Sequence, residues 1–250
     1  MSYDKTWDYS AQAKFYKYRP NYPVELINMI LGYVNPTNKN ISIADIGAGT
    51  GNLTLLLSKF KNASITAIEP NKNMMDIGIE RTKKLQNIVW VQSTGTETGL
   101  PDSSVDFVTF GSSFNVLDRQ AALQETYRIL KPGGYFCCMW NHRDLNDAIQ
   151  MKAEDIISSV IPDYTRGVRR EDQRPIIEQS GLFKDIVYIE MDFDFEQTLD
   201  TYINAWKSVK NKYWENDSDV FRTICDKFRA ELPKTFFIKY TSRCWIAKRK

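Results

Sequence analysis

The chain has 250 residues, of which 42% are hydrophobic and 26% charged, and its formal net charge is +2. Such a chain can bury a sizeable core, so we expect one globular domain over residues 1–250. The small net charge argues against an extended nucleic-acid or membrane surface. No apolar run approaches the roughly 20 residues of a membrane helix, and the polar start, Met1 to Lys5, does not resemble a signal peptide. These features predict a cytoplasmic protein.

Four cysteines stand in apolar surroundings without a Cys-x-x-Cys spacing, and the chain has a single histidine, His142. Zinc sites need several such ligands at short spacings, so we expect no metal site. Reduced thiols in a cytoplasmic protein are the simpler interpretation of these cysteines.

In chain order, the first predicted feature is a segment rich in aromatic residues, Trp7 to Arg19. It continues into Arg19-Pro20-Asn21-Tyr22-Pro23 and a helix that we expect over Val24–Tyr33. The two prolines restrict the backbone, which would aim Tyr16, Tyr18 and Arg19 together. Two interpretations stay open: the aromatic residues pack on the core, or residues 1–23 form a lid over a ligand.

Short apolar runs then alternate with helical patterns from residue 41 to residue 141. The runs predict five strands, namely Ile41–Ile46, Ser64–Glu69, Ile88–Gln92, Val105–Gly111 and Tyr135–Asn141. The helices predicted between them are Asn52–Phe60, Asn71–Leu85 and Arg119–Leu130, the last stopped by a turn at Lys131-Pro132-Gly133-Gly134. This alternation indicates βαβ units and a parallel sheet that is covered on both faces.

Beyond residue 141 the pattern is less regular. It predicts helices over Asp147–Val160, Glu171–Ser180, Thr198–Tyr213 and Asp217–Leu232, and strands over Ile186–Phe195 and Phe236–Lys248. A polar, basic loop is expected over Asp163–Arg170. Its Arg166, Arg169 and Arg170 could receive an acidic substrate or simply be solvated.

The most informative stretch is the turn that follows the first predicted strand. Asp45 lies near the end of the strand, and Gly47, Gly49 and Gly51 precede a helix. Glycine lets the backbone approach a ligand closely, and a helix N-terminus offers unpaired N–H groups. Glu69 ends the second predicted strand, where an acid can bind both hydroxyls of a ribose. The pattern predicts a nucleotide-like ligand; a tight turn without a ligand and a solvated acid are the alternatives.

The glycine spacing distinguishes between classes of nucleotide. A dinucleotide fingerprint, G-x-G-x-x-G, would need glycine in place of Asn52, and Asp45 would repel a pyrophosphate at the helix N-terminus. A cationic sulfonium ligand with an ammonium group meets no such objection. The stretch Asp45 to Gly51 therefore resembles motif I of the class I S-adenosylmethionine-dependent methyltransferases.

Other segments of residues 41–141 carry the same resemblance. Gly95 to Asp102 resembles the loop that holds the adenine in that family, and Gln124 to Gly134 resembles its later helix and turn. The resemblance implies an α/β, Rossmann-like class I methyltransferase fold, with a mostly parallel seven-stranded sheet, helices on both faces and a helical cap. It also implies a division into an N-terminal lid and helix (1–33), a cofactor-binding core (41–141), cap or substrate-side elements (142–180 and 196–232) and a closing strand (235–250).

A narrower resemblance extends over nearly the whole chain. Phe15 to Pro23 and Trp140 to Asp144 are similar to segments of the type 11 small-molecule subgroup that includes trans-aconitate methyltransferase-like proteins. One position departs from it: Asn115 stands where many relatives carry a histidine after the fourth strand. If that histidine is a base or a substrate contact, this chain does without it.

The resemblance implies that S-adenosylmethionine is the cofactor and assigns it a set of residues. Glu69 would bind the ribose, and Thr96 and Glu97 would border the adenine. Asp45 would order the glycine turn or contact the ligand amine, and Arg19 would pair with the cofactor carboxylate or form a surface salt bridge. The full set of expected cofactor-binding residues is Tyr16, Arg19, Asp45, Gly47, Ala48, Gly49, Gly51, Glu69, Pro70, Met74, Thr96, Glu97, Gly111, Ser112 and Phe114.

His142 is the candidate catalytic base. It follows the fifth predicted strand at the carboxyl end of the sheet, where ligands bind in such folds, although a surface position in a loop is the alternative. Methyl transfer from a sulfonium chiefly needs positioning and desolvation, and a base only when the nucleophile arrives protonated.

The leading hypothesis is a methyltransferase that acts on an oxygen, nitrogen or carboxylate of a small molecule. The second is a protein of this fold that binds the cofactor without methylating, and the third, nicotinamide-dependent oxidoreduction, is disfavoured by the glycine spacing. The fourth strand ends in Gly111-Ser112-Ser113-Phe114, without the Asp/Asn-Pro-Pro-aromatic signature of base methylation. We therefore expect no nucleic-acid or membrane partner, and a monomer or homodimer.

Overall fold

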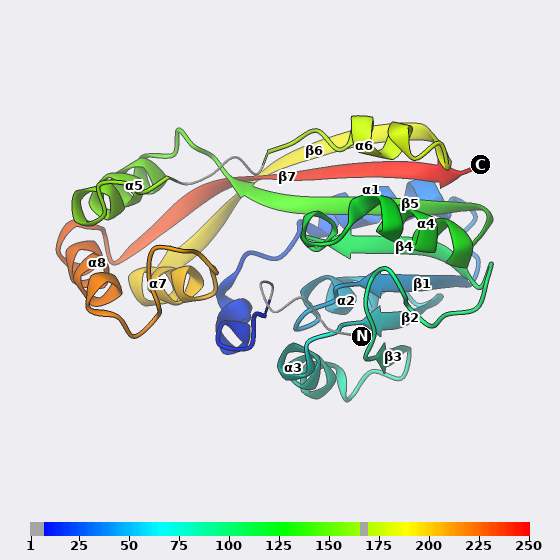
Figure 1. The fold of residues 1–250 in the computed structure, drawn as a ribbon, viewed down its shortest axis with the longest axis horizontal. Helices are drawn as coiled ribbons and strands as arrows, with labels where there is room; N and C mark the ends of the chain where they lie inside the picture. Colours follow the sequence, from blue (N-terminus) through cyan, green and yellow to red (C-terminus); the bar gives the residue numbers. More distant parts are fainter. Residues whose placement is uncertain (1–7, 166–169) are drawn as a thin grey trace.

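A computed structural model of the chain describes residues 8–165 and 170–250 (Figure 1). Its helices are α1 (Val24–Val34), α2 (Asn52–Leu57), α3 (Lys72–Thr82), α4 (Arg119–Ile129), α5 (Ala148–Val160), α6 (Arg174–Gln179), α7 (Leu199–Lys207) and α8 (Asp219–Glu231), with 3₁₀ helices η2 (Ala13–Tyr18) and η3 (Phe114–Val116). Its strands are β1 (Ile41–Ile46), β2 (Ala63–Ile68), β3 (Ile88–Val91), β4 (Val105–Gly111), β5 (Leu130–Arg143), β6 (Phe183–Thr198) and β7 (Thr235–Arg249).

The strands form one seven-stranded sheet in the order β3-β2-β1-β4-β5-β7-β6. Strands β1 to β5 pair in parallel, whereas β7 runs antiparallel to both of its neighbours. The sheet is therefore mostly parallel, and its order and directions are those of the class I methyltransferase fold, which confirms the predicted fold class.

Helices cover both faces of the sheet, as expected for buried parallel strands. One apolar cluster joins α1 and α2 to β1, β4, β5 and β7, and Leu26 and Ile30 of α1 are almost fully buried in it. A second cluster on the other face joins α4, α6 and η3 to the same strands, with Leu123 and Ile177 fully buried. The core thus holds the carboxyl ends of β1, β2, β4 and β5 in fixed positions along one edge.

A cap stands beyond that edge, on the left of Figure 1. Strands β6 and β7 continue to pair as far as Thr198 and Thr235, past the last β5–β7 pair at Arg143 and Tyr240. Helices α5, α7 and α8 pack on this extension around a third apolar cluster that includes Tyr202, Trp206, Phe221 and Phe228. The two long strands therefore carry the cap over the carboxyl edge of the sheet.

Several predicted boundaries need correction. Strand β5 extends to Arg143 because it pairs with β7, so His142 lies within a strand and opposite Thr241, not in a loop. The expected turn at Lys131–Gly134 falls inside β5 as an irregularity, because Val105 pairs with Leu130 while Phe107 pairs with Tyr135. Helix α6 lies in the range 142–180 that we assigned to the cap, yet its Ile177 packs on the main sheet.

Other predicted elements differ in length. The helix predicted over residues 198–213 ends at Lys207, where Ser208 follows as its C-cap. Strand β6 is longer at both ends than the predicted 186–195, because β7 offers it a partner along its whole length. Among the described residues, no helix is long and apolar enough to cross a membrane. Trp7, Arg166 and Arg169 lie outside the described residues.

Candidate active site

The glycine turn between β1 and α2 is built as the sequence predicted, with positive φ at Gly47 (67°), Gly49 (60°) and Gly51 (83°). These values belong to the left-handed region, which glycine adopts without strain. A Cβ on Gly47 would lie 2.4 Å from the Cβ of Ser113, and one on Gly49 would lie 3.2 Å from Cε of Met74. The turn therefore requires glycine for its backbone and for its packing against Ser113, the N-cap of η3, and against α3.

Asp45 is buried at the end of β1 and fastens this turn. Its Oδ2 accepts a hydrogen bond from Thr54 Oγ1 (2.6 Å) on α2, and its Oδ1 accepts one from Thr109 Oγ1 (3.0 Å) on β4. Burial raises the pKa of Asp45 to about 6, although the threonine hydroxyls oppose the shift. The carboxyl group thus ties the end of β1 to α2 and β4, on either side of the glycine turn.

Glu69 follows β2 and is only 6% exposed. Its Oε2 accepts from the backbone N–H of Gly49 (2.8 Å), and its Oε1 accepts from the N–H of Asn71 (2.9 Å). Burial raises the pKa of Glu69 to about 7, with a smaller contribution from Asp45, while the two N–H groups oppose the shift. The acid is therefore held rigidly beside the glycine turn, with oxygen lone pairs left for further donors.

Two adjoining cavities open at this edge of the sheet, and they share Tyr16, Arg19, Gly47, Gly49, Gly111, Ser112 and Asn141. The larger, of about 970 Å³, runs from Glu69 past the loop 92–96 to Asn115, Trp140 and His142. The smaller, of about 240 Å³, runs from the glycine turn toward the cap and ends at Arg143, α7 and Tyr240. In volume the larger cavity is in the range of small-molecule and cofactor sites.

Most of the expected cofactor-binding residues lie in the walls of these cavities. The larger cavity contains Tyr16, Arg19, Gly47, Gly49, Glu69, Pro70, Met74, Thr96, Gly111 and Ser112, and the smaller one adds Asp45 and Ala48. Gly51 lies just behind, as the N-cap of α2.

Two expected residues lie elsewhere. Phe114 is fully buried in the core, with its ring 5.3 Å from that of Phe110 and 5.4 Å from that of Phe136. The next residue, Asn115, lines the larger cavity in its place. Glu97 is turned away from both cavities, and its backbone N–H donates to Thr94 Oγ1 (3.2 Å).

The N-terminal segment closes one side of the site. Arg19 donates from Nε to Ser208 Oγ (2.9 Å) and from Nη2 to the carbonyl oxygen of Ser208 (2.6 Å), and its guanidinium lies 4.0 Å from the centre of the Tyr16 ring. Asn71 donates to Asp8 Oδ1 (2.8 Å), which ties the start of the segment to α3. The segment therefore bridges α3 and the cap helix α7 across the cavities.

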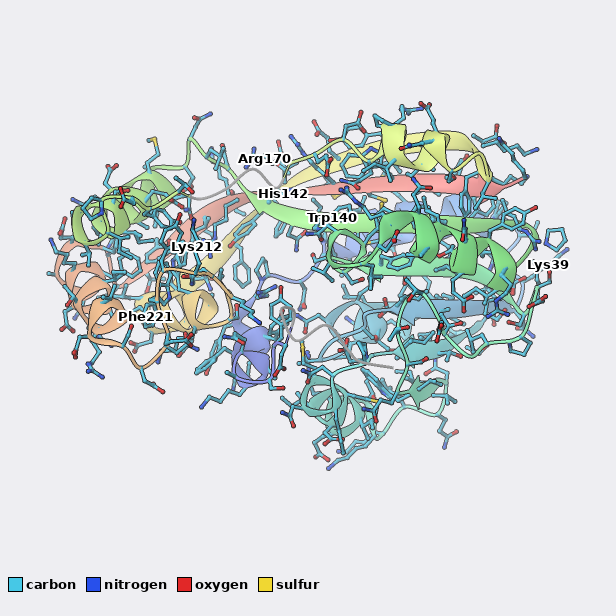
Figure 2. The ribbon with its side chains drawn as sticks, in the orientation of Figure 1. Lys39, Trp140, His142, Arg170, Lys212 and Phe221 are labelled. Carbon is cyan, nitrogen blue, oxygen red and sulfur yellow. The ribbon has the colours of Figure 1, made fainter. Side chains whose placement is uncertain are left out.

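The wall near β5 contains contacts that the sequence pattern did not predict. Trp140 donates from Nε1 to Asn115 Oδ1 (3.0 Å), which fixes the amide of Asn115. Figure 2 shows Trp140 and His142 along the outer part of β5, with Arg170 nearby. Tyr22 was also missed: its hydroxyl lies 2.9 Å from Ser112 Oγ and donates to the carbonyl of Met139 (3.2 Å). Strand pairing places Trp140 and His142, and packing of distant segments brings Tyr22 to Ser112 and Asn115 to Trp140, which local sequence does not show.

Within the described part of the chain, no cluster of three or more histidine, cysteine or acidic side chains could hold a metal ion.

Cys137 and Cys244 lie side by side, with their sulfur atoms 3.2 Å apart, and both are buried. The site is organised around the buried carboxyl groups of Asp45 and Glu69, the glycine turn and Arg19.

The sheet order and strand directions are those of the class I methyltransferase fold. Residues 44–138 match a family described as a methyltransferase domain. The chain is similar to demethylmenaquinone methyltransferase of Staphylococcus aureus (strain MRSA252), with 36% identity over 104 residues. That likeness covers 40% of this chain and 43% of the relative, so the chain matches less than half the length of such relatives.

Solved structures share the fold over most of the chain. A putative type II methyltransferase from Anaeromyxobacter dehalogenans has a TM-score of 0.59 and 17% identity, and the likeness covers 93% of this chain and 97% of that one. Phosphoethanolamine N-methyltransferase 2 of Haemonchus contortus, in complex with S-adenosyl-L-methionine, has a TM-score of 0.57 and 15% identity, covering 98% of this chain and 58% of that one. At these identities the likeness shows the fold.

Proposed function

We propose that the protein is an S-adenosylmethionine-dependent methyltransferase that acts on a small molecule. The observation that carries this proposal is Glu69, a buried acid in the cavity wall that is hydrogen-bonded to the glycine turn of a methyltransferase domain. A ribose needs an acceptor for two adjacent hydroxyls, and this carboxylate offers one at the carboxyl edge of the sheet.

The residues in the cavity walls fit the ribose, the adenine and the methionine portion of the cofactor in turn. Glu69 would hold the ribose, and the loop 93–96, beside Met74 and Pro70, would border the adenine. The turn at Gly47 to Gly49 would lie against the methionine portion, since neither position carries a side chain. Tyr16 and Arg19 would cover that end, because both line the two cavities.

When bound, the cofactor supplies a methyl group that is already activated by a sulfonium. The chain therefore has to hold the acceptor in line with that methyl group and keep water away. The cap, η2 and the end of β5 surround the position where an acceptor would sit. His142 is the candidate to accept a proton from an acceptor that arrives protonated, because it lines the larger cavity from β5.

The covered position of the site favours a small-molecule acceptor, because the cap and η2 cover the carboxyl edge of the sheet that a polymeric substrate would have to reach. The resemblance of residues 15–23 and 140–144 to the trans-aconitate methyltransferase-like subgroup supports the same class. The Staphylococcus aureus relative is named for demethylmenaquinone, but its likeness covers 40% of this chain and does not indicate the acceptor here.

The second candidate function is cofactor binding without methylation. It is favoured by Asn115, whose amide is fixed by Trp140 where many relatives carry a histidine. An amide cannot accept a proton at neutral pH, so a reaction that needs a base at this position would not proceed.

Calorimetry with S-adenosylhomocysteine and with NAD tests the cofactor, and release of S-adenosylhomocysteine from S-adenosylmethionine, in the presence of candidate acceptors, tests turnover. We expect binding of S-adenosylhomocysteine and none of NAD. Tight binding of NAD alone would refute the proposal. Binding of S-adenosylhomocysteine without turnover on any acceptor would favour the second candidate.

A further inference from the structure

Arg143, the last residue of β5, lines the smaller cavity with a partly buried guanidinium. Its Nε donates to the hydroxyl of Tyr240 (3.1 Å), and one face of the group lies 4.4 Å from the centre of the Trp206 ring. The centre of the Tyr202 ring lies 5.7 Å from the guanidinium carbon. The aromatic rings of the cap therefore fix the plane of the guanidinium.

The remaining edge of this guanidinium has no protein partner in the described part of the chain. The hydrogen bonds of its side chain there end at Tyr240, and no carboxylate of the described residues lies within 4 Å of it. Glu154 on α5 attracts it from a greater distance, but its Oε1 accepts from Gln150 Nε2 (2.6 Å). Two Nη groups in one plane are the arrangement that binds a carboxylate with two parallel hydrogen bonds.

The charged residues that line the smaller cavity also favour an anionic ligand. Its only charged wall residues in the described part of the chain are Arg19, Arg143 and Asp45. Asp45 is the single acid against two arginines, and both of its oxygens accept hydrogen bonds from threonine hydroxyls. The net field in the cavity is therefore positive, which favours an anionic ligand.

The position of Arg143 separates it from the cofactor. The glycine turn and Glu69 follow β1 and β2, whereas Arg143 ends β5, which lies two strands from β1 with β4 between. Neighbouring strands are about 4.8 Å apart, so β5 lies about 10 Å from β1. A carboxylate on Arg143 thus belongs to a molecule beside the cofactor, and Arg19, next to the glycine turn, is left for the cofactor itself.

We propose that Arg143 binds a carboxylate of the acceptor molecule, so that the acceptor is an anionic metabolite whose carboxylate is anchored in the smaller cavity, which Tyr240 also lines. That the bound anion is the methyl acceptor rests on the proposed function. The anion site at Arg143 can be tested by binding measurements alone.

The first experiment uses benzoate and its neutral counterpart benzamide as probes, because tyrosine rings line the cavity. Each is titrated into protein saturated with S-adenosylhomocysteine, and binding is followed by calorimetry or ligand-observed NMR. We expect the Kd of benzoate to be at least about tenfold below that of benzamide, the effect of a charge-assisted hydrogen-bond pair. Equal affinity for the two probes would overturn the proposal.

Three variants locate the effect. In Arg143→Gln the preference for benzoate should vanish, and in Arg143→Lys, which keeps the charge without the planar fork, it should shrink. Arg222→Gln removes the same charge from an exposed position on α8 and should leave the preference intact. The Kd of S-adenosylhomocysteine, which should change less than twofold in all three, reports that the site is folded. An unchanged preference in Arg143→Gln would overturn the assignment.

The second experiment separates the anion site from methylation. A small-molecule cell extract is divided on an anion-exchange resin at pH 7, and each fraction is offered to the protein with radiolabelled S-adenosylmethionine. Methylation confined to the retained, anionic fraction supports the proposal, and methylation of the unretained fraction alone overturns it. Methylation of neither fraction refutes the proposed function, whereas the benzoate titration still decides the anion site.

Discussion

Replacing Glu69 tests the ribose assignment most directly. Each hydrogen bond from a ribose hydroxyl to a charged carboxylate is worth about 1.5–3 kcal/mol, and the structure leaves room for two. Glu69→Ala should therefore weaken the binding of S-adenosylhomocysteine at least about tenfold at pH 8, where the acid is mostly ionised. The variant also leaves the N–H groups of Gly49 and Asn71 without their acceptor, so the fold must be checked by thermal denaturation.

The pH dependence gives a second, independent readout on the same residue. In the free protein the pKa of Glu69 is about 7, because the carboxyl is buried. Ribose hydroxyls donate to the ionised form, so binding lowers this pKa and releases a proton. The affinity should therefore be greatest above pH 7 and should fall, by at most about tenfold per pH unit, as the pH drops below 7.

Isothermal titration between pH 5.5 and 8.5 measures this profile, with Glu69→Gln as the matched variant. The amide keeps the shape of the side chain but cannot ionise, so its profile should lose the component near pH 7. Asp45, whose pKa is about 6, remains in both proteins, and the difference between the two profiles isolates Glu69. An unchanged Kd in Glu69→Ala, or the same profile in Glu69→Gln, would show that Glu69 is not the ribose ligand.

Two further predictions concern the turn and the N-terminal segment. Gly47→Ala should destabilise the protein by about 1–3 kcal/mol, because the added Cβ would meet Ser113 at 2.4 Å at a positive φ, whereas Gly32→Ala, with open space in α1, should be neutral or stabilising in the same denaturation assay. Equal effects would contradict the role given to the turn. Hydrogen exchange in residues 8–23 should slow when S-adenosylhomocysteine is added, as for a lid that orders over the ligand. Arg19→Ala should raise the exchange rate of this segment, because it removes both hydrogen bonds to Ser208. Exchange that is equally slow without ligand would make the segment a fixed part of the core.

The sequence alone predicted those parts of the candidate site that depend on residues close together in the chain. The turn at Gly47 to Gly51 and the acid at Glu69 are local signals, because a positive φ favours glycine and a strand that ends in an acid presents it at the sheet edge. The alternation of apolar runs and helical patterns likewise predicted the parallel core and its order of elements. These features follow from short-range sterics and from burial of alternating elements.

Only the tertiary structure decided which side chains meet across the sheet and the cap. His142 became a strand residue, and Arg143 came to face Tyr240 and Trp206, because β5 pairs with β7 about a hundred residues later in the chain. Phe114 packs in the core against the rings of Phe110 and Phe136, although its position in the sequence predicted that it would line the cofactor site. Long-range pairing and packing choose among side chains that look equivalent in sequence, since their free energy depends on partners that no local pattern specifies.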